Sequence, residues 1–320
     1  MKIIVFTIIF LFTFSISVVY SQQNDTETVD VEELFNKGNE LASLGKYQEA
    51  IELFDKILET GIESTSLLYN KALSLAYLGK YQEAIKLYVI ILEVEPNNVK
   101  VLSSKGLSLH DLGKYQEAIE FHDKALAVKQ NDTITLYNKA LSLYYLGQYQ
   151  NAIEWYDKVL EIEPNHVFAL TNKGIVLSSL EKYQEALEWF DKALKVETKQ
   201  INLLYSKGTT LIYLNKYQEA LEWLDKALGI NPDFVYALSY KCLTLSELGK
   251  YQEALKWLDR TLEVEPEFSL ALYSKGLVLS NLGKPDEGQK WFDKALNVNP
   301  NLSDTITNEQ IMPSNIQPNK

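Results

Sequence analysis

The sequence predicts an all-α protein made of a tandem array of helix pairs. Residues that break helices are scarce, because only 14 Gly and 8 Pro occur among 320 residues, well below the roughly 12% of an average protein. A hexapeptide beginning Gly45-Lys46-Tyr47 also returns, in close variants, every 34 residues, at positions 79, 113, 147, 181, 215, 249 and 283. Since 34 residues hold two helices and two short turns, residues 31–302 are interpreted as eight gapless repeats.

Each repeat carries the apolar pattern of two packed helices. Repeat positions are counted from the first residue of each unit, so Val31 and Thr65 both occupy position 1. Leucine at positions 4, 11 and 14 falls on one stripe of the first helix. Position 8 is always Gly, Ala or Cys, which predicts a close crossing with the second helix. The second helix is expected to begin near position 17.

These residues resemble the tetratricopeptide repeat, in which a small residue at 8 precedes residues such as Tyr47 at 17, Ala50 at 20, Phe54 at 24 and often Pro at 32. The resemblance covers residues 31–302. It implies a right-handed superhelical solenoid, with first helices lining a concave groove and second helices forming the convex back. It also implies a non-catalytic interaction scaffold that binds a peptide or protein in that groove.

The remaining segments are interpreted as export and linker sequences. Lys2 precedes an apolar run over residues 3–20, which is typical of a secretory signal, so residues 1–21 are expected to be a signal peptide. An uncleaved membrane anchor is the alternative, because about 18 residues are just long enough to span a bilayer. In either case the positive-inside rule predicts an extracytoplasmic protein, secreted or membrane-anchored. Residues 22–30 are expected to be a polar linker and residues 303–320 a disordered polar tail.

Composition narrows the classes of function. A net charge of −12 argues against a nucleic-acid partner, because phosphate binding needs an excess of Lys and Arg. A single cysteine, Cys242, with three histidines leaves too few ligands for a zinc or haem framework. The common nucleotide, metal and nucleophile motifs are missing from the sequence. We therefore expect neither an enzyme nor a cofactor.

The first departure from the family pattern is a lysine at position 7 of every unit. A bare ammonium on the apolar stripe would be unfavourable, so the stem is expected to lie on the core while the head reaches a carboxylate. Asp at position 25, as in Asp157, is the candidate partner. The second helices are also expected to carry exposed Glu–Lys pairs four residues apart, such as Glu188 with Lys192. Five tryptophans at position 23 either pack on the core or form a ridge for a partner: Trp155, Trp189, Trp223, Trp257 and Trp291.

The groove is predicted from the face of the first helix opposite its leucine stripe, namely positions 2, 5, 6, 9, 12 and 13. Few of these residues are charged, and tyrosines at positions 5 and 13 recur with a 68-residue period. The candidate peptide-groove residues are Tyr69, Asn70, Leu73, Tyr77, Tyr137, Asn138, Leu141, Tyr145, Asn172, Tyr205, Tyr213 and Tyr273. The tyrosines either anchor a ligand with apolar or aromatic side chains or pack between adjacent first helices.

The leading hypothesis is a monomeric, extracytoplasmic scaffold for an unidentified protein or peptide, attached to a membrane if residues 3–20 are retained. The alternative is a structural protein that self-assembles or organises an envelope, which the regular repeats also permit.

Overall fold

The computed structural model describes residues 30–302, and within this range the secondary structure consists of sixteen α-helices with no strand. This confirms the all-α fold class and the pairing of helices in each repeat. The predicted signal peptide at 1–21, nearly all of the linker at 22–30, and the tail at 303–320 lie outside the described residues.

Every first helix begins at repeat position 1 and every second helix at position 17. The first helices are α1 Val31–Ser43, α3 Thr65–Tyr77, α5 Val99–Asp111, α7 Thr133–Tyr145, α9 Val167–Ser179, α11 Ile201–Tyr213, α13 Val235–Glu247 and α15 Ser269–Asn281. The second helices are α2 Tyr47–Glu59, α4 Tyr81–Val94, α6 Tyr115–Val128, α8 Tyr149–Ile162, α10 Tyr183–Val196, α12 Tyr217–Ile230, α14 Tyr251–Val264 and α16 Pro285–Val298.

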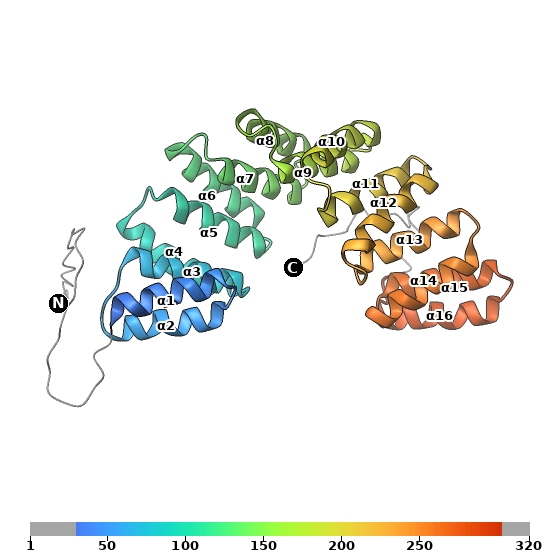
Figure 1. Ribbon diagram of the computed structural model, residues 1–320, viewed down its shortest axis with the longest axis horizontal. Helices are drawn as coiled ribbons and strands as arrows, with labels where there is room; N and C mark the ends of the chain where they lie inside the picture. Colours follow the sequence, from blue (N-terminus) through green and yellow to red (C-terminus); the bar gives the residue numbers. More distant parts are fainter. Residues whose placement is uncertain (1–29, 303–320) are drawn as a thin grey trace. The chain divides into compact units, whose positions relative to one another are not determined.

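The chain forms two compact units that divide between Lys80 and Tyr81. The first unit contains α1 to α3, and the second contains α4 to α16. Within the second unit, consecutive helices pack against one another from α4 to α16 (Figure 1). One apolar core cluster runs without interruption from Ile119 of α6 to Tyr240 of α13. The second unit is thus a continuous stack of repeats.

Within a repeat, the two helices touch most closely at position 8. A Cβ added to Gly174 would lie 2.5 Å from Phe190, and one added to Gly38 would lie 2.5 Å from Phe54. Both aromatic rings occupy position 24 of the second helix and are fully buried. This confirms the close crossing that the small residues predict.

In six of the eight repeats, the lysine at position 7 links its repeat to the one before it. Lys173 forms an ion pair with Asp157 of the preceding repeat, and its ammonium lies 3.8 Å from the ring centroid of Trp189 in its own repeat. The six ion pairs of this kind are Lys71–Asp55, Lys139–Asp123, Lys173–Asp157, Lys207–Asp191, Lys241–Asp225 and Lys275–Asp259. The expected partnership is confirmed, and the structure adds that it crosses the boundary between repeats.

The series is interrupted once in the second unit. The residue that would receive Lys105 is Val89 instead of aspartate. Burial then lowers the pKa of Lys105, and the nearby charge of Lys124 lowers it further. Its ammonium lies 4.0 Å from the ring centroid of Phe121, so the aromatic half of the arrangement is retained.

The prediction of exposed Glu–Lys ion pairs four residues apart is wrong, because no such pair occurs among the ion pairs of residues 30–302. Instead, the ammonium of Lys192 lies 3.6 Å from the ring centroid of Trp189, and that of Lys158 lies 3.5 Å from Trp155. A lysine three residues after tryptophan reaches the indole face, and this attraction outweighs a solvent-exposed ion pair. The half-buried tryptophans therefore pack between lysines and the core.

One buried side chain is poorly suited to its site. His122 occupies position 24 of the third repeat, is fully buried, and has no hydrogen-bond partner on either ring nitrogen. Burial lowers the pKa of His122 to about 3, and the charges of His110 and Lys139 act in the same direction. The ring is therefore neutral in the folded protein, whereas the unfolded chain takes up a proton below its ordinary pKa of about 6.5.

We predict that His122→Phe stabilises the protein increasingly as the pH falls. The neutral His122 does not reduce the free energy of unfolding above about pH 6.5. As the pH falls from 6.5 toward 3, the free energy of unfolding of the wild type decreases, because His122 takes up a proton only in the unfolded chain. The stabilisation by the variant should be about 3 kcal/mol larger at pH 4.5 than at pH 7.5. Urea unfolding at the two pH values measures this difference. Phenylalanine fits the site, since Gly174 already faces Phe190 in the fifth repeat. An equal increase in the free energy of unfolding at both pH values would contradict a buried, neutral His122 with a lowered pKa.

The turn between the two helices requires a left-handed backbone at position 15. Six units have glycine there with φ between +71° and +79°, as at Gly147. Glu181 and Asn215 adopt φ of 60° and 57° at the same position. A side chain other than Asn or Asp is strained in this region.

We predict that Glu181→Gly raises the free energy of unfolding by about 1 kcal/mol, because glycine removes this strain. Thermal unfolding followed by circular dichroism measures the change. Asn215→Gly is the matched control and should give a smaller gain, since asparagine tolerates the left-handed region. Glu181→Ala separates strain from side-chain loss, and a comparable gain from that variant would argue against the explanation.

Candidate functional site on the first helices

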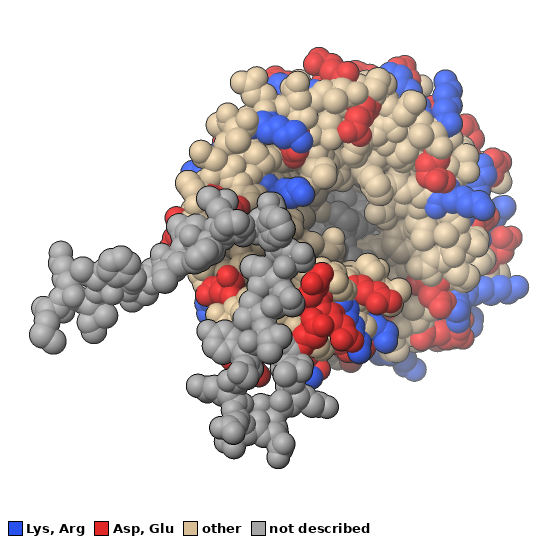
Figure 2. Space-filling view, turned by 60° about the vertical axis from the view of Figure 1, so that its left-hand side comes forward, with Lys and Arg blue, Asp and Glu red and all other residues tan. Residues whose placement is uncertain are grey.

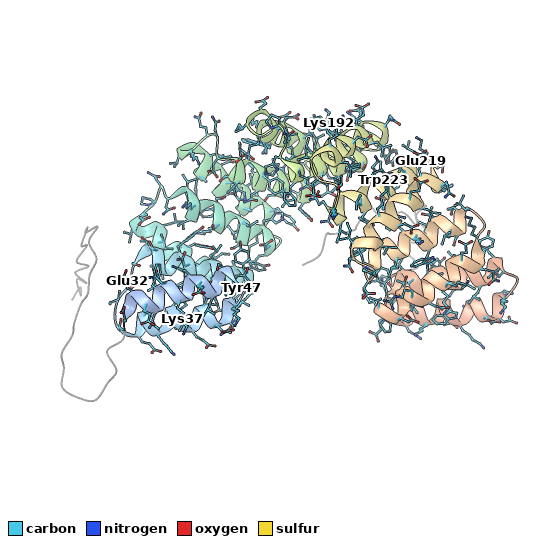
Figure 3. The ribbon with its side chains drawn as sticks, viewed as in Figure 1. Glu32, Lys37, Tyr47, Lys192, Glu219 and Trp223 are labelled. Carbon is cyan, nitrogen blue, oxygen red and sulfur yellow. The ribbon has the colours of Figure 1, made fainter. Side chains whose placement is uncertain are left out.

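In the first unit, three predicted groove residues line one cleft of about 460 Å³. Asn70, Leu73 and Tyr77 of α3 face it, together with Asn39 of α1 and Tyr47 at the start of α2. Figure 3 labels Tyr47 at this end of the helix pair. The amide of Asn70 donates a hydrogen bond to Oδ1 of Asn39 over 2.7 Å. The cleft therefore combines apolar and aromatic walls with two amides. Tyr69 is half-buried and is not among the residues that line it.

The tyrosines at position 5 of the second unit are placed mainly between neighbouring repeats. The hydroxyl of Tyr137 accepts a hydrogen bond of 2.8 Å from Asn172 in the next repeat, and burial raises the pKa of Tyr137 to about 12. The ring of Tyr205 lies 5.5 Å from that of Tyr240, edge to face, and burial raises its pKa. Tyr273 packs against Phe292 with ring centroids 4.9 Å apart. These three tyrosines pack between helices, which agrees with a packing role and not with a role as ligand anchors.

The tyrosines at position 13 stack on tyrosines at position 17, which lie outside the predicted groove. Tyr77 stacks on Tyr47 with ring centroids 4.8 Å apart, and Tyr213 stacks on Tyr183 at 5.0 Å. Tyr145 likewise stacks on Tyr115, at 5.4 Å. In each case the second ring is at position 17 of the preceding repeat. The sequence contained a signal for this pairing, because tyrosine occupies position 17 in every unit except the eighth.

The rest of the predicted groove is apolar or polar with few charges. Leu141 is half-buried, whereas Asn138 is buried with 7% of its surface exposed. The structure adds two large exposed side chains at position 2 of consecutive first helices, Ile134 at 68% and Phe168 at 57% exposure. Figure 2 shows charged residues scattered among larger areas of uncharged ones. Such a surface suits apolar side chains of a ligand.

The buried histidine His110 and the acidic residues of the described part of the chain do not form a metal-binding cluster. Residues 30–302 contain no cluster of three or more His, Cys, Asp or Glu side chains that could hold a metal ion. His110 hydrogen-bonds Ser142 over 3.0 Å, and burial lowers the pKa of His110 to about 4. A buried, neutral imidazole in a helix interface is a packing group here. None of the helices in this part of the chain is long and apolar enough to cross a membrane.

Comparison with known families agrees with the repeat assignment. Models of the tetratricopeptide repeat match residues 34–60, 69–132, 132–199 and 270–302. A model of the anaphase-promoting complex, cyclosome, subunit 3 matches residues 182–261. No curated protein matches the chain.

Several solved structures are similar in fold. A tetratricopeptide repeat protein from Parabacteroides merdae is 20% identical with a TM-score of 0.61, over 76% of this chain and 96% of that chain. The APC/C hetero-tetramer Cut9-Hcn1 is 17% identical with a TM-score of 0.65, over 86% of this chain and 55% of that chain. YrrB, described as a TPR protein with an unusual peptide-binding site, is 27% identical with a TM-score of 0.48, over 59% and 97%.

The first two of these structures support the fold alone, and the family rests on the repeat models together with the paired helices. The chain belongs to the tetratricopeptide-repeat family.

Proposed function

We propose that this protein is a non-catalytic scaffold that works outside the cytoplasm and binds a peptide or protein segment on the inner face of its first helices. The segment carries apolar or aromatic side chains. Tetratricopeptide repeats generally serve protein interaction, which supports a scaffold. The proposed class of ligand is argued from the surface chemistry of the first helices.

The observation that carries the proposal is the cleft of the first unit. Tyr77 is 64% exposed although its ring stacks on Tyr47, so a large apolar surface is held rigidly in solvent. Leu73 forms the wall beside it. Because Asn70 Nδ2 donates to Asn39 Oδ1, the groups left for an extended backbone are Nδ2 of Asn39 and Oδ1 of Asn70. An exposed, immobilised aromatic beside amides is typical of binding surfaces. A strongly acidic ligand is disfavoured because no cation lines the cleft.

Self-assembly by end-to-end stacking of repeats receives less support from the structure. Most interior second helices bury an apolar residue at position 21, such as Ile153 or Leu187. The last repeat has Gln289 at this position, and its side chain is exposed and donates a hydrogen bond to Asp293. A polar end resists the addition of another repeat. Light scattering coupled to size exclusion should therefore report a monomer at all concentrations.

We predict that a photocrosslinker at the cleft captures the partner. The experiment places p-benzoylphenylalanine at Leu73 and exposes the mature protein to extract from its own cell surface. A discrete crosslinked product should form, because a bound segment would lie against this side chain. The matched control carries the crosslinker at Glu222, an exposed position of a second helix. Identical products from both positions would contradict binding in the groove.

Two tyrosine variants then separate binding from packing. Tyr77→Ala should weaken binding of the captured partner by about 1 to 3 kcal/mol with little loss of stability, because this ring is exposed. Tyr205→Ala should instead lower the free energy of unfolding by about 3 kcal/mol, because this ring is mostly buried. Calorimetric titration and urea unfolding measure the two effects. Unchanged binding by Tyr77→Ala would remove the first cleft from the proposal.

The location outside the cytoplasm rests on residues 1–21 and needs its own test. We predict that native protein begins near Gln22, because Val19 and Ser21 are small enough to precede a cleavage site. Mass spectrometry of the N-terminal peptide measures this. An intact Met1 or Lys2 on membrane-bound protein would replace secretion with anchoring, and an intact N-terminus on protein from the cytoplasmic fraction would refute export.

A further inference from the structure

A second cleft, of about 600 Å³, lies where the fourth and fifth repeats meet, between the second helices α8 and α10. Its apolar lining includes Leu160 of α8, Leu170 of α9 and Val196 of α10. Trp189 and Lys192 of α10 also face it. In Figure 3 Lys192 is on the outer side of the second unit. This cleft uses none of the predicted groove residues.

The charged side chains that line this cleft are both cations, in a chain whose net charge is −12. They are Lys192 and Lys195, one helical turn apart on α10. Neither lysine forms an ion pair with any carboxylate of residues 30–302. Asn165 contributes an uncharged polar group to the same lining. The cleft is therefore a local positive site with no internal counterion.

Comparison among the repeats shows that this charge is specific to one of them. Lys195 occupies position 29, where the fifth repeat alone has a basic residue. The other repeats carry Glu59, Glu93, Ala127, Glu161, Gly229, Glu263 and Asn297 at this position. A general requirement of the helix pair would give the same charge in every repeat. The basic residue is thus not needed for the repeat structure.

The tryptophan fixes the position of one of the two cations. The ammonium of Lys173 lies over the Trp189 ring at 3.8 Å from its centroid, and that of Lys192 lies over the same ring at 3.6 Å. The charge of Lys173 is paired with Asp157, whereas that of Lys192 is not. An ammonium held against an indole ring loses less conformational freedom when it binds an anion. The cleft therefore presents one positioned cation and one additional cation beside an apolar floor.

We propose that this cleft binds an acidic segment of a partner protein that also carries a large apolar side chain. The apolar side chain contacts Leu160, Leu170 and Val196, and flanking carboxylates pair with Lys192 and Lys195. A volume of about 600 Å³ is far larger than a simple anion needs, and it lies within the range of pockets that take small organic molecules, which leaves room for one large side chain. The proposal is independent of ligand binding in the groove of the first helices.

The test uses fluorescein-labelled peptides and protein that comprises residues 30–320. The first probe is an amidated peptide with one phenylalanine flanked on each side by two glutamates. The second has lysine in place of each glutamate, and the third has glycine in place of phenylalanine. Fluorescence anisotropy at low salt should show binding of the first probe only. Added salt should weaken this binding, because exposed charges are screened.

The decisive variant is Lys195→Glu, which should weaken binding of the first probe at least tenfold while circular dichroism stays unchanged. Lys226→Glu is the matched control. Lys226 lies 3.6 Å from the ring centroid of Trp223, as Lys192 does from Trp189, but the sixth repeat has Gly229 at position 29 in place of a lysine. This control should change the affinity less than twofold. Equal weakening by both variants, no effect of Lys195→Glu, or no binding of the first probe by the wild type would each overturn the proposal.

Discussion

The structure depends first on the close contact between position 8 of the first helix and position 24 of the second. Phe190 is fully buried and leaves no room for a Cβ on Gly174, so the two helices of that repeat can approach only with glycine there. In the fourth repeat the same crossing combines Ala140 with Tyr156. Because the crossing recurs every 34 residues, each pair presents the same apolar edge to the next pair. A continuous core from Ile119 to Tyr240 is the consequence.

A second set of contacts keeps successive repeats in register. The lysine at position 7 joins a tryptophan of its own repeat to an aspartate of the preceding one, as Lys173 does with Trp189 and Asp157. Only about a tenth of the Lys173 side chain is exposed, so solvent screens the pair less than it would on an open surface. This arrangement uses charge on the second-helix side and leaves the first-helix face to aromatic and apolar groups.

The tyrosines at positions 5 and 13 share a 68-residue period but have different structural roles. Those at position 5, such as Tyr205, are mostly buried between adjacent repeats. Those at position 13, such as Tyr77, stack on a tyrosine of the preceding repeat and keep one side toward solvent. The exposed apolar surface of these first helices therefore includes the position-13 tyrosine Tyr77 together with Ile134 and Phe168. Duplication of a two-repeat block accounts for the period without requiring a ligand at every tyrosine.

The sequence alone predicts the all-α class, the eight-repeat register, the start of each second helix, the close crossing at position 8 and the partnership of Lys with Asp. Each of these follows from a period or a local helical angle, which the chain repeats many times. The packing of the helices was needed to learn that Lys173 pairs across a repeat boundary, that Lys192 covers Trp189 instead of pairing with Glu188, and that Tyr205 is covered. It also decided which unit has a basic cleft. A helical angle gives the direction of a side chain but not what the neighbouring helix places in front of it, because burial depends on how repeats stack.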